Sequence, residues 1–105
     1  MALVALREVD PAVGRAAELA AAWFGCDPGD VLGRGKYAAT ARARLVMYAA
    51  IRTVYGWGWS EIGRRTGRDH STIRHGVRCA IALDAEACRR VAKQLADWRA
   101  SQCAA

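Results

Sequence analysis

The sequence predicts an all-α protein of five or six helices, and three observations lead to this class. Alanine supplies much of the apolar content, and alanine favours helix over strand. Two Asp-Pro pairs precede apolar residues at helical spacing, as at helix openings. No run of alternating apolar and polar residues indicates a strand. With 105 residues, we expect one domain, residues 1–105, with a single modest core.

The first two helices are expected to open at Asp10-Pro11 and Asp27-Pro28. In each pair the aspartate offers a side-chain acceptor at the N-cap, and the proline stands where no N–H is needed. The first helix is expected to end at Gly25, and the second is a short turn of helix. The predicted inward residues of the first helix are Val13, Ala16, Ala17, Ala20, Trp23 and Phe24.

A loop, GRGKYAAT (33–40), precedes a long helix that is predicted to begin at Thr40 or Ala41 and to end at the GWGW turn. Apolar residues occupy two adjoining sides of this helix, which predicts a central helix with several neighbours. We expect Arg42 and Arg44 in its first turn, where positive charge opposes the helix dipole. A bound phosphate would relieve that conflict.

Residues Trp59–Leu83 are predicted to form two short helices joined by a turn that contains glycine. This arrangement predicts a helix-turn-helix. The turn is TGR (66–68). Gly63 lies inside the first of the two helices at a cost in helix stability, and close approach of a crossing helix would explain it. A last helix is predicted over about residues 84–101.

The second helix of the pair has one apolar side and one polar side. When Ile73 points inward, Val77, Ala80 and Ile81 fall on the same side. Every side chain on the opposite arc can donate a hydrogen bond. These side chains are Ser71, Thr72, Arg74, His75 and Arg78.

The positive charge of the chain is concentrated in one segment. Residues 34–78 contain ten Lys/Arg against two acidic residues, a net charge of +8, while the remainder has six against eight, a net charge of −2. A solvated basic face and a footprint for a polyanion both fit this distribution. The helix-turn-helix pattern favours DNA as the polyanion. RNA is less favoured, because no aromatic stacking platform accompanies the basic residues.

The N-terminal residues of a recognition helix are the ones that reach base edges, and in this chain they are polar. Asp69 is a candidate helix cap and also a candidate acceptor for a cytosine amino group. His70 could pack on a thymine methyl group or cover the turn. Ser71 and Thr72 could bind base or phosphate.

A catalytic or metal role for the same residues is not supported. Adjacent side chains at a helix start diverge, so Asp69, His70 and Ser71 cannot form a nucleophile–base–acid relay. His70 and His75 are five residues apart and lie on different faces of a helix, and there is no H-E-x-x-H motif. We therefore expect no enzyme activity, no metal and no cofactor.

The stretch GRDHSTIRHGVR (67–78) resembles the signature of the C-terminal DNA-binding domain of DnaA, the bacterial replication initiator. The resemblance extends to SEIG (60–63), TARAR (40–44) and VLGRGK (31–36), and it covers about residues 11–83.

The resemblance implies that the helix-turn-helix reads a DnaA-box-like duplex. The residues implied to contact bases in the major groove are Asp69, His70, Ser71, Thr72 and His75. Lys36 is implied to enter the adjacent minor groove, and Arg44 and Arg52 match positions of DNA contact. From the basic segment as a whole, we also expect backbone contacts from Arg34, Arg42, Arg68, Arg74 and Arg78.

Three departures from the family pattern stand out. The turn between EIG and RDH is one residue shorter than is usual, so the angle between the two helices could differ. Lys36 stands where the family usually has arginine, and lysine lacks the planar fork that suits insertion into the minor groove. The chain has no P-loop, so we expect a stand-alone DNA-binding protein without nucleotide binding or ATP-driven origin melting.

The sequence therefore predicts a small sequence-specific regulator of replication initiation or of transcription, of the kind that a phage or mobile element could encode. The alternative is a protein-interaction module in which Trp57, Trp59 and Trp98 form an exposed patch and the basic face meets an acidic partner; if these tryptophans lie in the core instead, replacing them would unfold the protein. A homo-oligomer through the last helix is left open.

Four cysteines without C-x-x-C spacing favour reduced thiols. The apolar start MALVAL lacks the features of a signal peptide. We therefore expect a cytoplasmic, nucleoid-associated protein with no membrane partner.

Overall fold

A computed structural model describes residues 9–104 and places six helices in this range, with no strand among the described residues. The helices are α2 (Pro11–Phe24), α3 (Pro28–Leu32), α4 (Ala38–Tyr55), α5 (Trp59–Thr66), α6 (His70–Leu83) and α7 (Ala85–Ala104). The all-α prediction is confirmed. The apolar start of the chain, residues 1–8, lies outside the described range.

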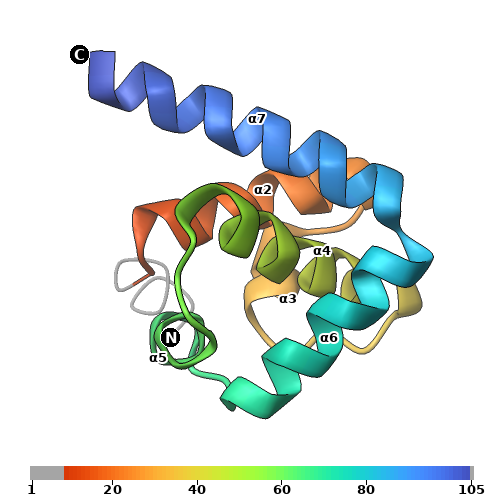
Figure 1. Cartoon of the computed structure of the whole chain (residues 1–105). Coiled ribbons are helices and arrows are strands. Elements are labelled where there is room, and N and C mark those ends of the chain that lie inside the picture. The colour runs from red at the N-terminus through yellow and green to blue at the C-terminus, as the bar shows by residue number, and fades with distance from the viewer. Residues whose placement is uncertain (1–8, 105) are drawn as a thin grey trace.

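The central helix is α4, which packs against α2, α3, α5, α6 and α7 (Figure 1). Its largest buried side chains, Met47, Tyr48 and Ile51, are each no more than 2% exposed. Val31 of α3, Ile62 of α5 and residues from α2, α6 and α7 join them in one apolar cluster. The prediction of a central helix with several neighbours is confirmed.

The predicted Asp-Pro openings form as expected. Asp10 Oδ1 accepts a hydrogen bond from the Ala12 N–H at 2.9 Å, and Asp27 Oδ1 accepts from the Gly29 N–H at 2.8 Å. Asp10 has a second role, because its other oxygen pairs with Arg65 of α5. The cap of the first helix is therefore also a tie between α2 and the helix-turn-helix.

Three predicted details of the fold are wrong. The long helix begins at Ala38, two or three residues early, and the last helix extends to Ala104. Trp23 is 45% exposed and Ile81 is 57% exposed, although both were predicted to point inward. Each lies near the end of its helix, where none of the helices of residues 9–104 covers the position that helical spacing assigns to the core.

The alternative of an exposed tryptophan patch is also wrong. Trp57, Trp59 and Trp98 are half-buried and pack against the apolar core. Each also has an arginine guanidinium over its ring, at 4.1 Å from the ring centre for Trp57, 4.6 Å for Trp59 and 5.8 Å for Trp98. These rings pack within the domain, so they do not form the exposed patch that the alternative required.

The turn between α5 and α6 depends on two glycines. Gly67 ends α5 with φ at +72°, a left-handed conformation that glycine adopts without steric cost. Gly63 faces the turn itself, because a Cβ atom at this position would lie 2.6 Å from the Arg68 carbonyl oxygen. The predicted reason for Gly63, a crossing helix, is wrong: the close neighbour is the backbone of the turn.

We predict that Gly63→Ala lowers the free energy of unfolding by about 1–3 kcal/mol, since the added methyl group collides with backbone that cannot rotate away. The measurement is urea denaturation followed by circular dichroism. Gly14→Ala in α2 is the matched control, because the nearest atom to its Cβ is a Val9 methyl carbon at 3.5 Å, an ordinary contact. This control should raise stability by about 0.5–1 kcal/mol, and equal effects of the two substitutions would contradict the packing of the turn.

Candidate nucleic-acid interface

The N-terminal half of α6 is exposed on one side, and this side is polar. Asp69, His70, Ser71, Thr72 and His75 are all exposed, as the sequence predicted. On the other side of the helix, Ile73 and Val77 are buried against α4. In Figure 1 the start of α6 lies at the opposite edge of the molecule from α7.

Asp69 caps α6. Its Oδ2 accepts hydrogen bonds from the Ser71 N–H at 3.0 Å and from the Ser71 hydroxyl at 2.6 Å. These hydrogen bonds hold the pKa of the Asp69 carboxyl below its ordinary value. The carboxylate side chain is still 63% exposed, so capping leaves it accessible.

The geometry is not that of a catalytic relay. The Ser71 hydroxyl donates directly to the carboxylate of Asp69, whereas a nucleophile would donate to the histidine. His70 Nδ1 lies 4.0 Å from Asp69 Oδ1, which is beyond hydrogen-bond distance. Asp69 and Ser71, whose residue types could suggest a hydrolase, therefore form a helix cap.

His75 lies one turn further along the exposed side of α6. Its Nε2 is 3.5 Å from the Sγ of Cys79, the residue four positions later. The residue itself is exposed. Across residues 9–104, no cluster of three or more His, Cys, Asp or Glu side chains is arranged to hold a metal ion.

Four basic residues extend the polar surface of α6. Arg74 and Arg78 are exposed on α6, and Arg34 and Lys36 are exposed in the 33–37 loop. In the described part of the chain, none of the four side chains makes an ion pair or a hydrogen bond. Their charges are therefore not neutralised by any residue within 9–104.

Tyr37 was not singled out in the sequence, and the structure makes it prominent. It is 82% exposed, immediately after Lys36, and its side chain does not cap α4. The signal that could have drawn attention to it was an aromatic residue beside two basic ones in a glycine-containing loop.

Arg44 and Arg68 are directed into the protein, toward the loop that carries Lys36. Arg44 of α4 donates to the carbonyl oxygens of Val31 at 2.9 Å, Asp30 at 2.8 Å and Gly35 at 3.2 Å. Arg68 of the turn donates to the carbonyl oxygen of Gly33. Burial and the nearby charge of Arg68 lower the pKa of Arg44.

Arg42 and Arg52 also have partners inside the protein. Arg42 pairs with Asp84 and lies over the Phe24 ring, 5.0 Å from its centre. Arg52 donates to the Trp57 carbonyl oxygen at 2.7 Å. Because α4 begins at Ala38, neither Arg42 nor Arg44 lies in its first turn, so the predicted conflict with the helix dipole does not exist.

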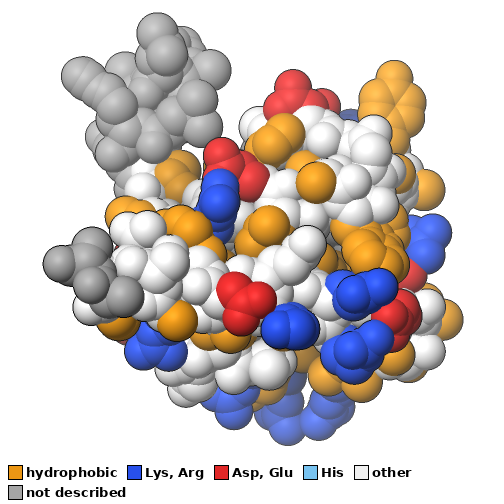
Figure 2. All heavy atoms as spheres, turned by 90° about the horizontal axis from the view of Figure 1, so that it is seen from above, with side chains coloured by type: hydrophobic (Ala, Val, Ile, Leu, Met, Phe, Trp, Pro, Cys, Tyr) orange, Lys and Arg blue, Asp and Glu red, His pale blue; other side chains and the backbone are white. Residues whose placement is uncertain are grey.

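The α7 side of the molecule differs in its charge pattern. Figure 2 looks onto this side and shows acidic and basic side chains interspersed. Arg89 pairs with Glu86 at 2.6 Å and Lys93 pairs with Asp97 at 3.3 Å. The charges within each pair neutralise each other, in contrast to the cations of Arg34, Lys36, Arg74 and Arg78, which pair with no described residue.

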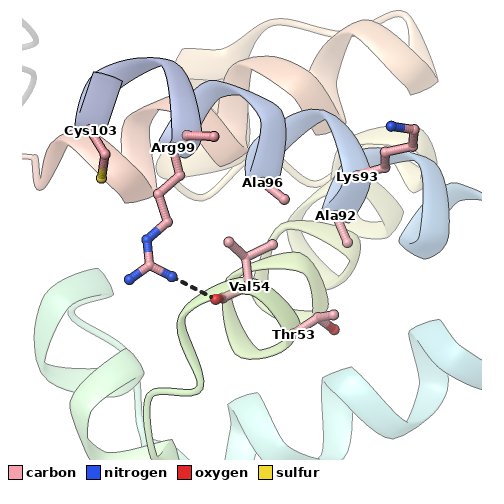
Figure 3. Close-up of a pocket in the computed structure, with 8 residues that line it drawn as sticks. Thr53, Val54, Ala92, Lys93, Ala96, Arg99 and Cys103 are labelled. Carbon is pink, nitrogen blue, oxygen red and sulfur yellow. Dashed lines mark hydrogen bonds between the residues drawn. The ribbon is translucent and has the colours of Figure 1, made fainter. Parts of the chain in front are cut away.

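A groove of about 610 Å³ lies between the end of α4 and α7 (Figure 3). Arg99 reaches across it and donates to the Val54 carbonyl oxygen at 2.9 Å. Ala92, Ala96 and Ala100 of α7 line it with small apolar side chains. The groove includes none of the predicted DNA-contacting residues.

The arrangement defines a class of protein: a helical domain whose helix-turn-helix exposes a polar recognition helix. A family model described as the bacterial DnaA protein helix-turn-helix matches residues 16–79, which is more than half of the chain. The chain belongs to this family, and membership implies binding to double-stranded DNA by a non-catalytic domain. No curated protein and no solved structure matches the chain. Within the described residues, no helix is both long and apolar enough to cross a membrane.

We predict that Asp69→Ala lowers the melting temperature by a few degrees, because it removes the acceptor that caps α6. Asp69→Asn keeps an acceptor and should melt close to the wild type at neutral pH. Since the pKa of Asp69 is lowered by folding, the carboxylate's contribution is present above about pH 4 and is lost as the pH falls through the folded-state pKa.

The wild type should therefore lose stability in acid relative to Asp69→Asn. Differential scanning calorimetry between pH 3 and pH 7 measures both effects. Identical melting of the alanine and asparagine variants at neutral pH would rule out the cap.

Proposed function

We propose that the protein is a sequence-specific reader of double-stranded DNA that places the start of α6 in the major groove of a DnaA-box-like duplex. The observation that carries the proposal is the exposed polar arc of α6, which includes Arg74 and Arg78, together with Arg34 and Lys36 of the loop; none of these four cations pairs with a described residue. Membership of the DnaA helix-turn-helix family supports the same mode of docking. The proposed base-contacting residues are Asp69, His70, Ser71, Thr72 and His75 in the major groove and Lys36 in the minor groove.

Asp69 serves this function in two ways. As a cap, it orders the first turn of α6, on which the other base-contacting residues depend. Its exposed carboxylate can also accept a hydrogen bond from the amino group of cytosine. The Ser71 hydroxyl, which donates to Asp69 in the free protein, can rotate to donate to base or phosphate.

The phosphate contacts are proposed for the exposed cations. Arg34, Arg74 and Arg78 can each neutralise a phosphate without losing a hydrogen bond or ion pair to any described residue. Tyr37 extends the same surface and can pack its ring on the sugar-phosphate backbone beside Lys36.

The biological role follows from occupancy of DNA. A domain of 105 residues that binds initiator-type sites can compete for them or share them, and it can act as a regulator of replication initiation or of transcription. We place this activity on the nucleoid, in the cytoplasm. We propose that the chain acts as one domain, with no nucleotide and no chemical step.

We predict that His70→Ala reduces the preference for a DnaA-box duplex over a scrambled duplex by about fivefold or more, as expected for loss of one base contact. Fluorescence anisotropy with both duplexes at near-physiological salt measures this ratio. Arg90→Ala, on the exposed side of α7, is the control and should leave the ratio unchanged. A wild type that binds both duplexes equally, or a His70→Ala variant with the wild-type ratio, would overturn the assignment of α6 as the reader.

We predict that Arg78→Ala weakens binding to both duplexes by the same factor and lowers the slope of log K against log salt by about 0.9, because one phosphate contact is lost. Titrations at four salt concentrations give the slope. Arg90→Ala again removes one positive charge, but away from the proposed interface. Equal changes in slope for the two variants would mean that binding responds to net charge alone.

A further inference from the structure

The 33–37 loop and the helix-turn-helix are joined by arginine side chains. Arg44 reaches from α4 to the carbonyl oxygens of Asp30 and Val31 at the end of α3 and to that of Gly35 in the loop. Arg68 reaches from the turn to the carbonyl oxygen of Gly33, at the start of the loop. Arg68 stands directly before Asp69, the cap of α6. A single side chain therefore connects the start of the proposed reading helix to the loop that carries Lys36.

The 33–37 loop, which Arg44 and Arg68 both contact, is also closely packed. A Cβ atom at Gly35 would lie 2.8 Å from the Thr40 methyl carbon and 3.0 Å from the Asp30 Cβ, so the loop packs closely on its neighbours. The Gly35 N–H donates to the Asp30 carbonyl oxygen at 3.3 Å and the Gly33 N–H to the Gly29 carbonyl oxygen at 2.9 Å. The loop is thus held by its own backbone and by the two arginines.

The turn between α5 and α6 is also fixed by backbone contacts. The Arg68 N–H donates to the Gly63 carbonyl oxygen at 3.0 Å, and the Arg68 carbonyl oxygen is the atom that excludes a side chain at residue 63. The backbone of Arg68 is thus fixed against α5. Its side chain therefore extends from a fixed position to the carbonyl oxygen of Gly33 in the loop.

The partners of the two arginines indicate the role. Among the residues that the structure describes, neither guanidinium pairs with a carboxylate; all four of their acceptors are backbone carbonyl oxygens. Backbone acceptors fix the path of a loop, whereas carboxylate partners would only neutralise charge. Tyr48, 2% exposed, lies close to both guanidinium groups, and burial raises the pKa of its hydroxyl.

We propose that Arg44 and Arg68 are positioning residues that lock the 33–37 loop to the start of α6, so that Lys36 and the reading helix meet the two grooves of a duplex as one preformed unit. This inference rests on the proposed function. It replaces the direct DNA contacts that the sequence suggested for both arginines. A preformed pair of contacts avoids the entropy cost of ordering the loop on binding, and it fixes the distance between the two groove contacts.

The first test uses no DNA. Amide hydrogen exchange at Gly33 and Gly35 should accelerate at least tenfold in Arg68→Met and in Arg44→Lys, while amides in α2 and α7 keep the wild-type rate. Arg44→Lys keeps the positive charge but lacks the fork that reaches three carbonyl oxygens. Unchanged exchange in the loop for both variants overturns the lock, whether or not the protein binds DNA.

The second test is a double-mutant cycle on a DnaA-box duplex. Lys36→Ala should weaken binding by about tenfold in the wild-type background, and by less than twofold in the Arg68→Met background, because an unlocked loop no longer holds Lys36 in place. If Lys36→Ala costs the same factor in both backgrounds, Arg68 contacts phosphate independently and the positioning role is wrong. If the loop loosens as expected but the wild type binds no duplex, the lock stands as a feature of the loop and the proposed function fails.

Discussion

The burial of α4 is the constraint on which the rest of this structure depends. Five helices pack around it, and Val46, Ala50 and Ile51 are fully buried. A helix surrounded in this way has few positions from which a charged side chain can reach solvent. Its arginines therefore satisfy their donors at the rim of the core, on loop carbonyl oxygens, on Asp84 and on aromatic faces. The same side chains fix the loop and the turn that α4 supports.

Much of the fold could be predicted because its signals are local. Two or three consecutive residues are enough to recognise the Asp-Pro openings of α2 and α3. The end of α5 is likewise marked by one residue, Gly67. The start of α4 carries no such signal: the side chain of its N-cap residue, Tyr37, makes no capping hydrogen bond. Helical spacing also cannot reveal where a neighbouring helix ends, which is why Trp23 and Ile81 were assigned to the core and are exposed.

The candidate site was predictable in part, for a related reason. The exposed side of α6 follows from the spacing of Ile73 and Val77 within one helix, and the structure places it as predicted. The partners of the arginines are distant in sequence: Arg68 and Gly33 are 35 residues apart, and Arg42 and Asp84 are 42 apart. A count of charges treats all ten cations of the basic segment alike. Only the fold separates those that face solvent from those that hold the protein together.

The proposed interface consists of the start of α6 and the 33–37 loop, and each is ordered in a different way. The start of α6 needs an acidic cap to order its first turn, and Asp69 supplies it while remaining exposed. The basic loop needs a defined path, because Lys36 lies outside the helices. In α6 this order is supplied by Asp69, which is itself a proposed contact, and in the loop by Arg44 and Arg68, so that little ordering is left for binding.

The central claim is that the 33–37 loop and the start of α6 form one DNA-binding surface. The most direct measurement is an NMR titration of the isotope-labelled protein with a DnaA-box duplex. The account predicts amide shift changes concentrated at residues 33–37 and 67–78, saturating together at the same DNA concentration, with α7 unaffected. Shift changes centred on the groove between α4 and α7, or saturation of the loop and α6 at different concentrations, would contradict it.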